Sequence, residues 1–440
     1  MMIRILFLAG VLLCTGAAAP DASDPVQLGL AQARERRAPV LIDYSAPWCY
    51  SCYYMKRNVL TGPEWAKAER ETVVVELDAD SPVGAHYMAA WSVKAMPTYL
   101  LFDADGKELG RILGEQTRAD FYRWLNAAIG RGNPLDSLKA AVVDGSRKSV
   151  AAAREVLRAY HARYDAAGGL AWKATLAAPA QEALARDERA SAWIARLRLQ
   201  QAAVAKDAAA CLGAAGPVFA ADLGCERPYE LDKVLACSEG RGEAERGALL
   251  RSQAKPMQAL LDQRVLAKPR CADERSVVLV TADLYAALGD AGAEKGALDR
   301  AIDDLKKRVA GDLKKDRNLS DNLRAYLERA RRTEELDAML VRLIAAYPDD
   351  YVYAGRYARN LAARGKHAEA LPYFEQAAGK AYGVNKLRNA ESHARSLQAL
   401  SRNAEARRVL AEALQANGPW FPEDAAKLKA LMLQLPPAAT

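Results

Sequence analysis

Two cysteines separated by two residues, Cys49 and Cys52, constrain the fold of this chain more than any other feature. They follow an apolar run of strand length, residues 40–44, and open a stretch with helical character, residues 48–60. The free N–H groups at the first turn of a helix stabilise a thiolate, so the first cysteine becomes a nucleophile. The second cysteine then attacks the mixed disulfide and releases the bound group. This placement predicts a redox dithiol in which Cys49 attacks and Cys52 resolves.

Zinc is the alternative for this spacing, because structural zinc sites also use two cysteines two residues apart. Such a site needs two further ligands. The chain has no second pair with this spacing, and His86 is the only histidine within residues 20–130. We therefore favour the dithiol and expect neither a metal nor a cofactor.

The residues around the motif alternate between strand and helix patterns. Asp103-Ala104-Asp105-Gly106 predicts a hairpin turn, because Asp-Gly tolerates the positive φ angles of tight turns. The pattern indicates an α/β sheet with helices on both faces. The expected strands are 40–44, 72–77, 97–102 and 108–113, and the expected helices are 25–37, 48–60, 82–91 and 117–129.

In this order of elements, Trp48 and the two cysteines resemble the active-site motif of the thioredoxin family. Met96-Pro97-Thr98 is similar to the cis-proline segment of that family. The resemblance implies that Met96 and Pro97 pack against the disulfide and bind an extended substrate chain. It also implies that Asp43 is the buried carboxylate that takes the proton of the resolving cysteine. Trp48 and Tyr50 flank the nucleophile, as an apolar substrate platform or as core residues.

Details of the motif place the resemblance nearest to the periplasmic thioredoxin-like branch of the family. Tyr50 and Ser51 separate the cysteines, and neither is the histidine that stabilises the thiolate in strong oxidants. Glu76 stands near the position of the buried lysine of cytosolic thioredoxin. The resemblance therefore implies a reductase, although these residues leave the direction of electron flow open.

The first residues read as an export signal, with Arg4, an apolar run over residues 5–13 and a small-residue cleavage zone at 17–19. We predict a signal peptide over residues 1–19 and a periplasmic location. A buried N-terminal element and a lipid anchor on Cys14 are the alternatives. No later segment has the apolar length of a membrane helix, and the net charge of +7 shows no basic block of the kind that binds nucleic acid.

The four remaining cysteines follow the linker at residues 130–134. We expect structural disulfides in a loop-rich helical segment, because an exported protein with an even number of cysteines favours pairing. Three pairings are possible, and the shortest loops favour Cys211–Cys225 with Cys237–Cys271. A relay of electrons from one of these pairs to the Cys49–Cys52 pair is the alternative.

Beyond residue 134 the chain reads as helices. Leu336 and Ala370 lie 34 residues apart and begin similar patterns, and Ala406 begins a looser copy. This spacing resembles the tetratricopeptide repeat, although a generic helical bundle with chance spacing is the alternative. We expect an α/β thioredoxin fold followed by an all-α helical extension with tetratricopeptide-like repeats. The expected segments are a signal peptide at 1–19, a thioredoxin-like domain at 20–130, a helical domain at 134–275 and repeats at 276–422.

The sequence thus predicts a periplasmic thiol:disulfide oxidoreductase that acts on protein disulfides or dithiols, while its helical region recruits partners. A membrane or periplasmic redox partner would exchange electrons with it. The alternative is an interaction scaffold whose thioredoxin-like domain serves as a docking module.

Overall fold

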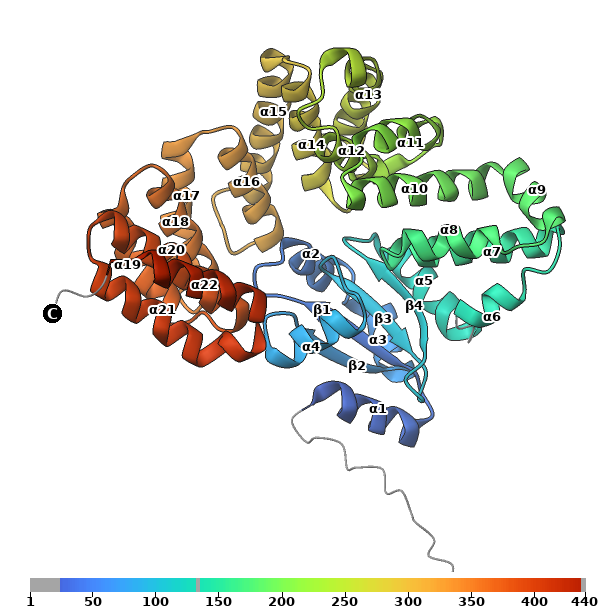
Figure 1. Cartoon of the computed structure of the whole chain (residues 1–440), viewed down its shortest axis with the longest axis horizontal. Helices are drawn as coiled ribbons and strands as arrows, with labels where there is room; N and C mark the ends of the chain where they lie inside the picture. The colour runs from blue at the N-terminus through green and yellow to red at the C-terminus, as the bar shows by residue number, and fades with distance from the viewer. Residues whose placement is uncertain (1–23, 132–134, 437–440) are drawn as a thin grey trace, which may run out of the picture.

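A computed structural model describes residues 24–131 and 135–436 of the 440-residue chain. The predicted signal peptide, including Cys14, lies outside the described residues. An α/β domain occupies the N-terminal part, and the rest of the described chain is helical (Figure 1).

A four-stranded sheet in the order β2-β1-β3-β4 forms the centre of the α/β domain. Strand β1 pairs parallel with β2 and antiparallel with β3, and β4 closes the sheet antiparallel to β3. The strands are β1 (Val40–Ser45), β2 (Val73–Asp78), β3 (Thr98–Phe102) and β4 (Glu108–Leu113). The predicted hairpin turn is confirmed, since Gly106 has a φ of +84° and its N–H donates to the Asp103 carbonyl.

Helices cover both faces of the sheet. Helices α1 (Pro25–Arg36) and α4 (Pro82–Ala90) pack on the face that carries Ile42 and Tyr44, whereas α2 (Tyr50–Asn58), α3 (Gly62–Glu71) and α5 (Arg118–Arg131) pack on the face that carries Leu41. Helix α3 was not among the helices expected from the sequence. Thr61 and Pro63 are its start signals, but its buried face is narrow, because only Ala68 is fully buried.

The first half of the helical region follows α5 and holds the four remaining cysteines. Its helices are α6 (Leu135–Ala140), α7 (Arg147–Ala162), α8 (Ala166–Ala174), α9 (Ala178–Arg186), α10 (Glu188–Ala205), α11 (Ala208–Ala220), η1 (Gly224–Glu226), α12 (Arg227–Cys237) and α13 (Glu243–Arg264). The expectation that the segment with the four cysteines is loop-rich was wrong, because most of it is helical and Pro217 and Pro256 lie inside helices α11 and α13. Each proline removes only one helical N–H donor, and packing around buried residues such as Met257 holds the helix together.

The second half consists of helices joined in pairs by short turns. These helices are α14 (Glu274–Ala287), α15 (Ala291–Val309), α16 (Arg317–Arg329), α17 (Thr333–Ala346), α18 (Val352–Ala363), α19 (His367–Ala378), α20 (Gly383–Ala399), α21 (Asn403–Asn417), η2 (Gly418–Trp420) and α22 (Pro422–Gln434). The turns of four successive pairs contain a residue with positive φ, namely Gly289, Arg331, Gly365 and Ser401. The pairs therefore share one turn geometry.

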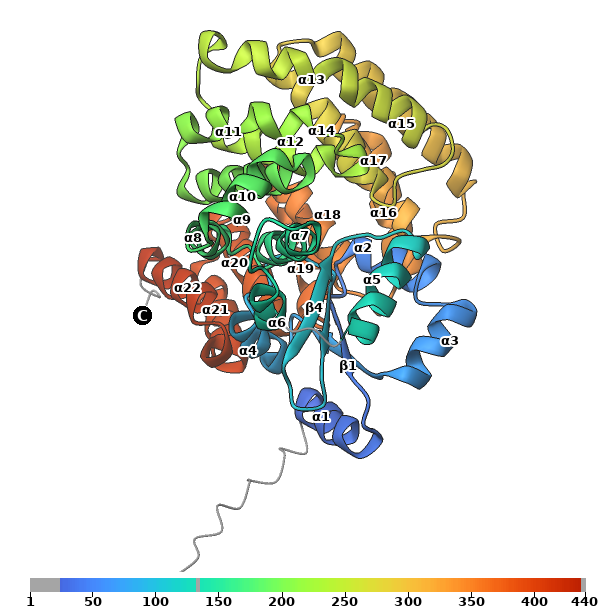
Figure 2. The ribbon, with the colours of Figure 1, turned by 90° about the vertical axis from the view of Figure 1, so that its right-hand side faces the viewer.

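The helical region curves around the α/β domain as an arc (Figure 1). Helices α6 and α7 lie beside β4, α10 to α15 pass above the sheet, and α16 packs against α2. Figure 2 shows the helices from α7 to α13 stacked above one another over the α/β domain. In the described part of the chain, no helix combines the length and apolarity that crossing a membrane requires.

Candidate redox site

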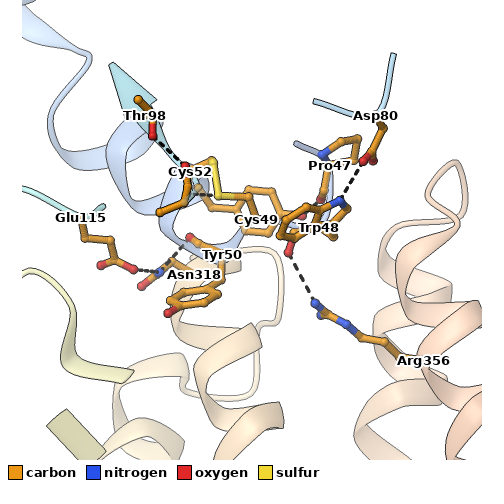
Figure 3. The surroundings of a disulfide bond; sticks show 12 residues. Pro47, Trp48, Cys49, Tyr50, Cys52, Asp80, Thr98, Glu115, Asn318 and Arg356 are labelled. Atoms are coloured by element: carbon orange, nitrogen blue, oxygen red, sulfur yellow. Dashed lines mark hydrogen bonds between the residues drawn. A yellow bond between two sulfur atoms is a disulfide. The ribbon is translucent and has the colours of Figure 1, made fainter. Parts of the chain in front are cut away.

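Cys49 and Cys52 form a disulfide at the N-terminus of α2 (Figure 3), with 5.2 Å between their Cα atoms. Cys49 is the N-cap residue, and its sulfur accepts a hydrogen bond from the backbone N–H of Cys52 at 3.1 Å. After reduction, the same N–H group and the positive end of the helix dipole would face a Cys49 thiolate. The structure therefore places the predicted nucleophile where a thiolate is stabilised.

Asp43 lies in β1, opposite Glu76 of β2, and only 2% of its surface is exposed. Burial raises the pKa of Asp43 to about 6, Lys56 lowers it, and Glu76 raises it further. Lys56 and Glu76 themselves form an exposed ion pair at 2.9 Å. A buried carboxyl with a pKa near neutrality can accept and return a proton, as the sequence analysis expected of Asp43.

The Met96–Pro97 peptide bond is cis, and it precedes β3 at the same end of the sheet as the cysteines. Met96 packs on the core cluster that contains both cysteines. The Pro97 carbonyl accepts from the N–H of Gly114, so the segment is tied to the loop after β4. The structure thus brings Met96 and Pro97 together with the cysteine pair.

Trp48 is held between the α/β domain and the helical arc. Its indole N–H donates to Asp80 at 3.1 Å, and Asp80 also accepts from the Tyr351 hydroxyl at 2.9 Å and from Asn385 at 2.7 Å. The Trp48 ring packs against the buried residues Tyr351 and Val352. Trp48 is therefore engaged by helices α18 and α20 rather than exposed as a platform.

Two side chains of the arc bind the backbone of the cysteine motif (Figure 3). Asn318 of α16 donates to the carbonyl of Tyr50 at 3.0 Å, and Arg356 of α18 donates to the carbonyl of Trp48 at 3.4 Å. Arg356 also pairs with the fully buried Asp321. The helical arc thus supplies part of the lining of the redox site.

Two of the three tyrosines of α2 are covered by arginines of the arc. The Arg275 guanidinium lies 3.4 Å from the ring centroid of Tyr50, and the Arg317 guanidinium lies 4.2 Å from that of Tyr53. Burial raises the pKa of Asp321, but the Arg324, Arg356 and Arg275 side chains around it hold that pKa well below its usual range. Asp321 therefore fixes Arg275 and Arg356 over the motif as a buried counter-ion.

Glu115 is a buried acid beside the motif. It follows β4, is 6% exposed, and accepts a hydrogen bond from Asn318 at 3.4 Å through Oε1. Its Oε2 has no hydrogen-bond partner among the described residues. Burial raises the pKa of Glu115 well above its usual value, and the nearby Asp273 raises it further. Burial therefore favours the protonated form of Glu115.

The four remaining cysteines pair as Cys211–Cys237 and Cys225–Cys271. The expected pairs Cys211–Cys225 and Cys237–Cys271 were both wrong, because Cys211 lies in α11 and the rest of that helix carries the chain away from it before Cys225. At 1.5 Å per residue, the stretch of α11 from Cys211 to the helix end at Ala220 spans roughly 13 Å, whereas a disulfide needs Cα atoms within about 7 Å. Short separation in sequence therefore did not mean proximity. No cluster of three or more potential metal ligands is present in the described ranges.

Sequence reasoning missed Asp80, Glu115, Asn318 and Arg356. Asn318 and Arg356 follow the residues that they contact by 268 and 308 positions. No local pattern marks such contacts. Glu115 follows a predicted strand directly, and an acid at a strand end near the motif was the only available signal.

The family model of the thioredoxin-like domain matches residues 26–129. The thiol:disulfide interchange protein DsbD of Cronobacter sakazakii is 32% identical over 95 residues, which are 21% of this chain and 16% of that protein. DsbD of Pseudomonas fluorescens is 33% identical over 111 residues, 24% of this chain and 19% of that protein. The chain thus spans less than a fifth of the length of these relatives.

Among solved structures, a thioredoxin from Thermus thermophilus is 26% identical and covers 25% of this chain and 87% of its own, with a TM-score of 0.24. The family match makes the N-terminal part of the described chain a thioredoxin-like α/β domain, and an all-helical region follows it. The match of residues 26–129 includes the cysteine pair and supports thiol:disulfide oxidoreductase activity.

Proposed function

We propose that this chain is a periplasmic thiol:disulfide oxidoreductase that works as a reductase of protein disulfides. The observation that carries the proposal is the Cys49–Cys52 disulfide at the N-cap of α2, with the buried Asp43 in the adjacent strand. The absence of a histidine between the cysteines favours the reductive direction. The export-like N-terminus and the two further disulfides favour an oxidising compartment.

The proposed reaction starts from the reduced pair. The Cys49 thiolate attacks one sulfur of the substrate disulfide and expels the other as a thiolate, which leaves a mixed disulfide on Cys49. Asp43 takes the proton of Cys52, whose thiolate attacks Cys49 and releases the second substrate thiol. The substrate gains two electrons and the pair becomes the disulfide seen here. A reduced dithiol of a redox partner then returns two electrons to the pair.

We further propose that helices α14 to α21 form tetratricopeptide-like repeats that recruit partners. The shared positive-φ turns, at Arg331, Gly365 and Ser401, support a repeating unit. A scaffold is the second candidate function, and one observation favours it. The thioredoxin-like domain is docked against the arc with Cys49 only 3% exposed, as in a domain that serves for attachment.

Trapping of mixed disulfides distinguishes the two functions. A Cys52→Ser variant of the full chain, expressed in the periplasm, should accumulate covalent complexes with substrates on a non-reducing gel, because no resolving thiol releases them. The matched control carries Cys49→Ser as well and should show none. If neither variant traps a protein, while partners are still captured through residues 276–422, the enzyme is refuted and the scaffold is supported.

A further inference from the structure

The helical arc leaves the redox pair little open surface. Cys49 and Cys52 are each 3% exposed, and helices α18 and α20 hold Trp48 on one side. Asn318 and Arg356 bind the carbonyls of the residues on either side of Cys49. A folded protein that approaches a thioredoxin-like motif needs a broad contact area, and the chain's own helices occupy that area.

A cavity of about 1080 Å³ lies next to the motif, between the α/β domain and helices α7, α10 and α12. Tyr50, Ser51, Met96 and Glu115 line it, so it adjoins the cysteine motif and the cis-proline segment together. This volume is at the upper end of the range for small-molecule sites. It suits a ligand longer than a single small thiol compound.

The lining of the cavity fits a polypeptide segment. Trp124, Trp193 and Tyr229 offer faces for apolar side chains, and the Glu108–Arg163 ion pair, at 2.7 Å, lies at its edge. Glu115 lines the cavity together with Ser51 of the motif, and its Oε2 has no hydrogen-bond partner among the described residues although the side chain is more than nine-tenths buried. A buried polar atom without a partner is costly, and a peptide can supply one, because its backbone carries both N–H and C=O groups.

We propose that this cavity binds an extended, cysteine-bearing peptide segment of the substrate and that the arc excludes folded proteins from the redox pair. The proposal rests on the proposed function, and it narrows the substrate to unfolded or locally unfolded chains. The segment lies in the cavity lined by β4, α7, α10 and α12 and meets the motif beside Met96. Attack by Cys49 on the segment's disulfide sulfur then follows the two-step exchange given above, with the partner dithiol as the source of electrons.

Three probes of increasing size test the proposal on the reduced full chain. They are the small aromatic disulfide dithiobis-nitrobenzoate, a short linear peptide whose single cysteine forms a disulfide with glutathione, and native insulin, so that the peptide and insulin both expel an alkyl thiolate. We expect the peptide to be reduced with a kcat/KM about tenfold above that of insulin, a difference of about 1.4 kcal/mol in barrier. Comparable rates for peptide and insulin would overturn the proposal, as would reduction of the small disulfide alone.

A variant that fills the cavity gives a second test. Ala159 of α7 lines the cavity, whereas Ala151 of the same helix is exposed and does not. Ala159→Trp should lower the ratio of peptide rate to small-disulfide rate about tenfold, while Ala151→Trp keeps the ratio of the original chain. An equal ratio in both variants would overturn the proposal.

Two further measurements show whether a low peptide rate comes from a misfolded variant or from an inactive cysteine pair rather than from a filled cavity. If Ala159→Trp melts early, Glu115→Leu decides, because it removes the polar group that faces the ligand and keeps a side chain of similar size. It should raise KM for the peptide more than it changes kcat, and unchanged KM would overturn the assigned contact. If no probe is reduced, or if Cys49→Ser is as fast as the original chain, the proposed function itself fails.

Discussion

Replacement of Asp43 by asparagine is expected to stabilise the oxidised protein at neutral pH. Asp43 is 2% exposed, and burial raises its pKa from 3.8 to about 6. The folded protein therefore holds this proton more tightly than the unfolded chain does. One pKa unit corresponds to 1.36 kcal/mol, so ionisation of Asp43 destabilises the folded state by about 3 kcal/mol.

The sign of the pH dependence follows from the two pKa values. Below pH 3.8 Asp43 is protonated in both the folded and the unfolded chain, so its ionisation does not lower the free energy of unfolding. Between pH 3.8 and about 6 the unfolded chain releases the proton first, so stability falls as pH rises. Above about pH 6 the loss is complete. The amide introduced by Asp43→Asn cannot ionise, so the variant escapes this loss.

Urea unfolding at a series of pH values, followed by tryptophan fluorescence, measures the effect. The free energy of unfolding of Asp43→Asn minus that of the original chain should rise by about 3 kcal/mol from below pH 3.8 to above pH 6. Asp105→Asn, which replaces an exposed acid in the β3–β4 turn, is the matched control and should show a flat difference. A flat or falling difference for Asp43→Asn would refute the reasoning.

Two further predictions concern the arc. A Cβ on Gly383 would lie 1.6 Å from the Asp80 carbonyl oxygen, so Gly383→Ala should push α20 from the α/β domain and speed alkylation of reduced Cys49 about tenfold. Gly365 also has a positive φ, but its Cβ would meet open space, so Gly365→Ala should leave the alkylation rate of Cys49 unchanged. Equal alkylation rates in the two variants would contradict the contact between Gly383 and Asp80. Joint replacement of Cys225 and Cys271 by serine opens a 46-residue loop, so it should cost about 4 kcal/mol in urea unfolding without slowing reduction of dithiobis-nitrobenzoate. A non-reducing peptide map of the original chain checks the pairing itself, and a Cys211–Cys225 crosslink in that map would contradict it.

The sequence predicted the α/β domain because its signals are local. Successive side chains of residues 40–44 point to opposite faces of the sheet, and both faces are buried. Asp105-Gly106 fits a tight turn, and the cysteine pair stands at the start of a helix. Helix α3 was not predicted, because only one of its residues is fully buried and its apolar pattern is therefore weak. The cysteine pairing escaped because a rule based on loop length ignores the rigidity of an intervening helix.

The coverage of the redox site depends on tertiary contacts that no local pattern encodes. Asn318 lies in a helix whose buried face includes polar residues such as Asp321 and Asn322, and a solvated helix face has a similar composition. The polar face of α16 contacts α2 only because the helices before it bring α16 to that position. The sequence indicated which residues do the chemistry, but it did not indicate which residues control access to them.

The chemistry of the contact between arc and domain limits how this protein works. Hydrogen bonds, an ion pair between Arg57 and Asp316, and stacked guanidinium groups hold α16 against α2. Contacts of this kind each contribute little net stability, because water satisfies the separated groups almost as well. The contact between α16 and α2 is therefore held by polar groups rather than by a large apolar core. Because Asn318 and Arg356 bind the motif itself, any opening that admits a larger partner also removes two of the motif's hydrogen bonds. Asn318 and Arg356 therefore couple the accessibility of Cys49 to the conformational order of the backbone around it.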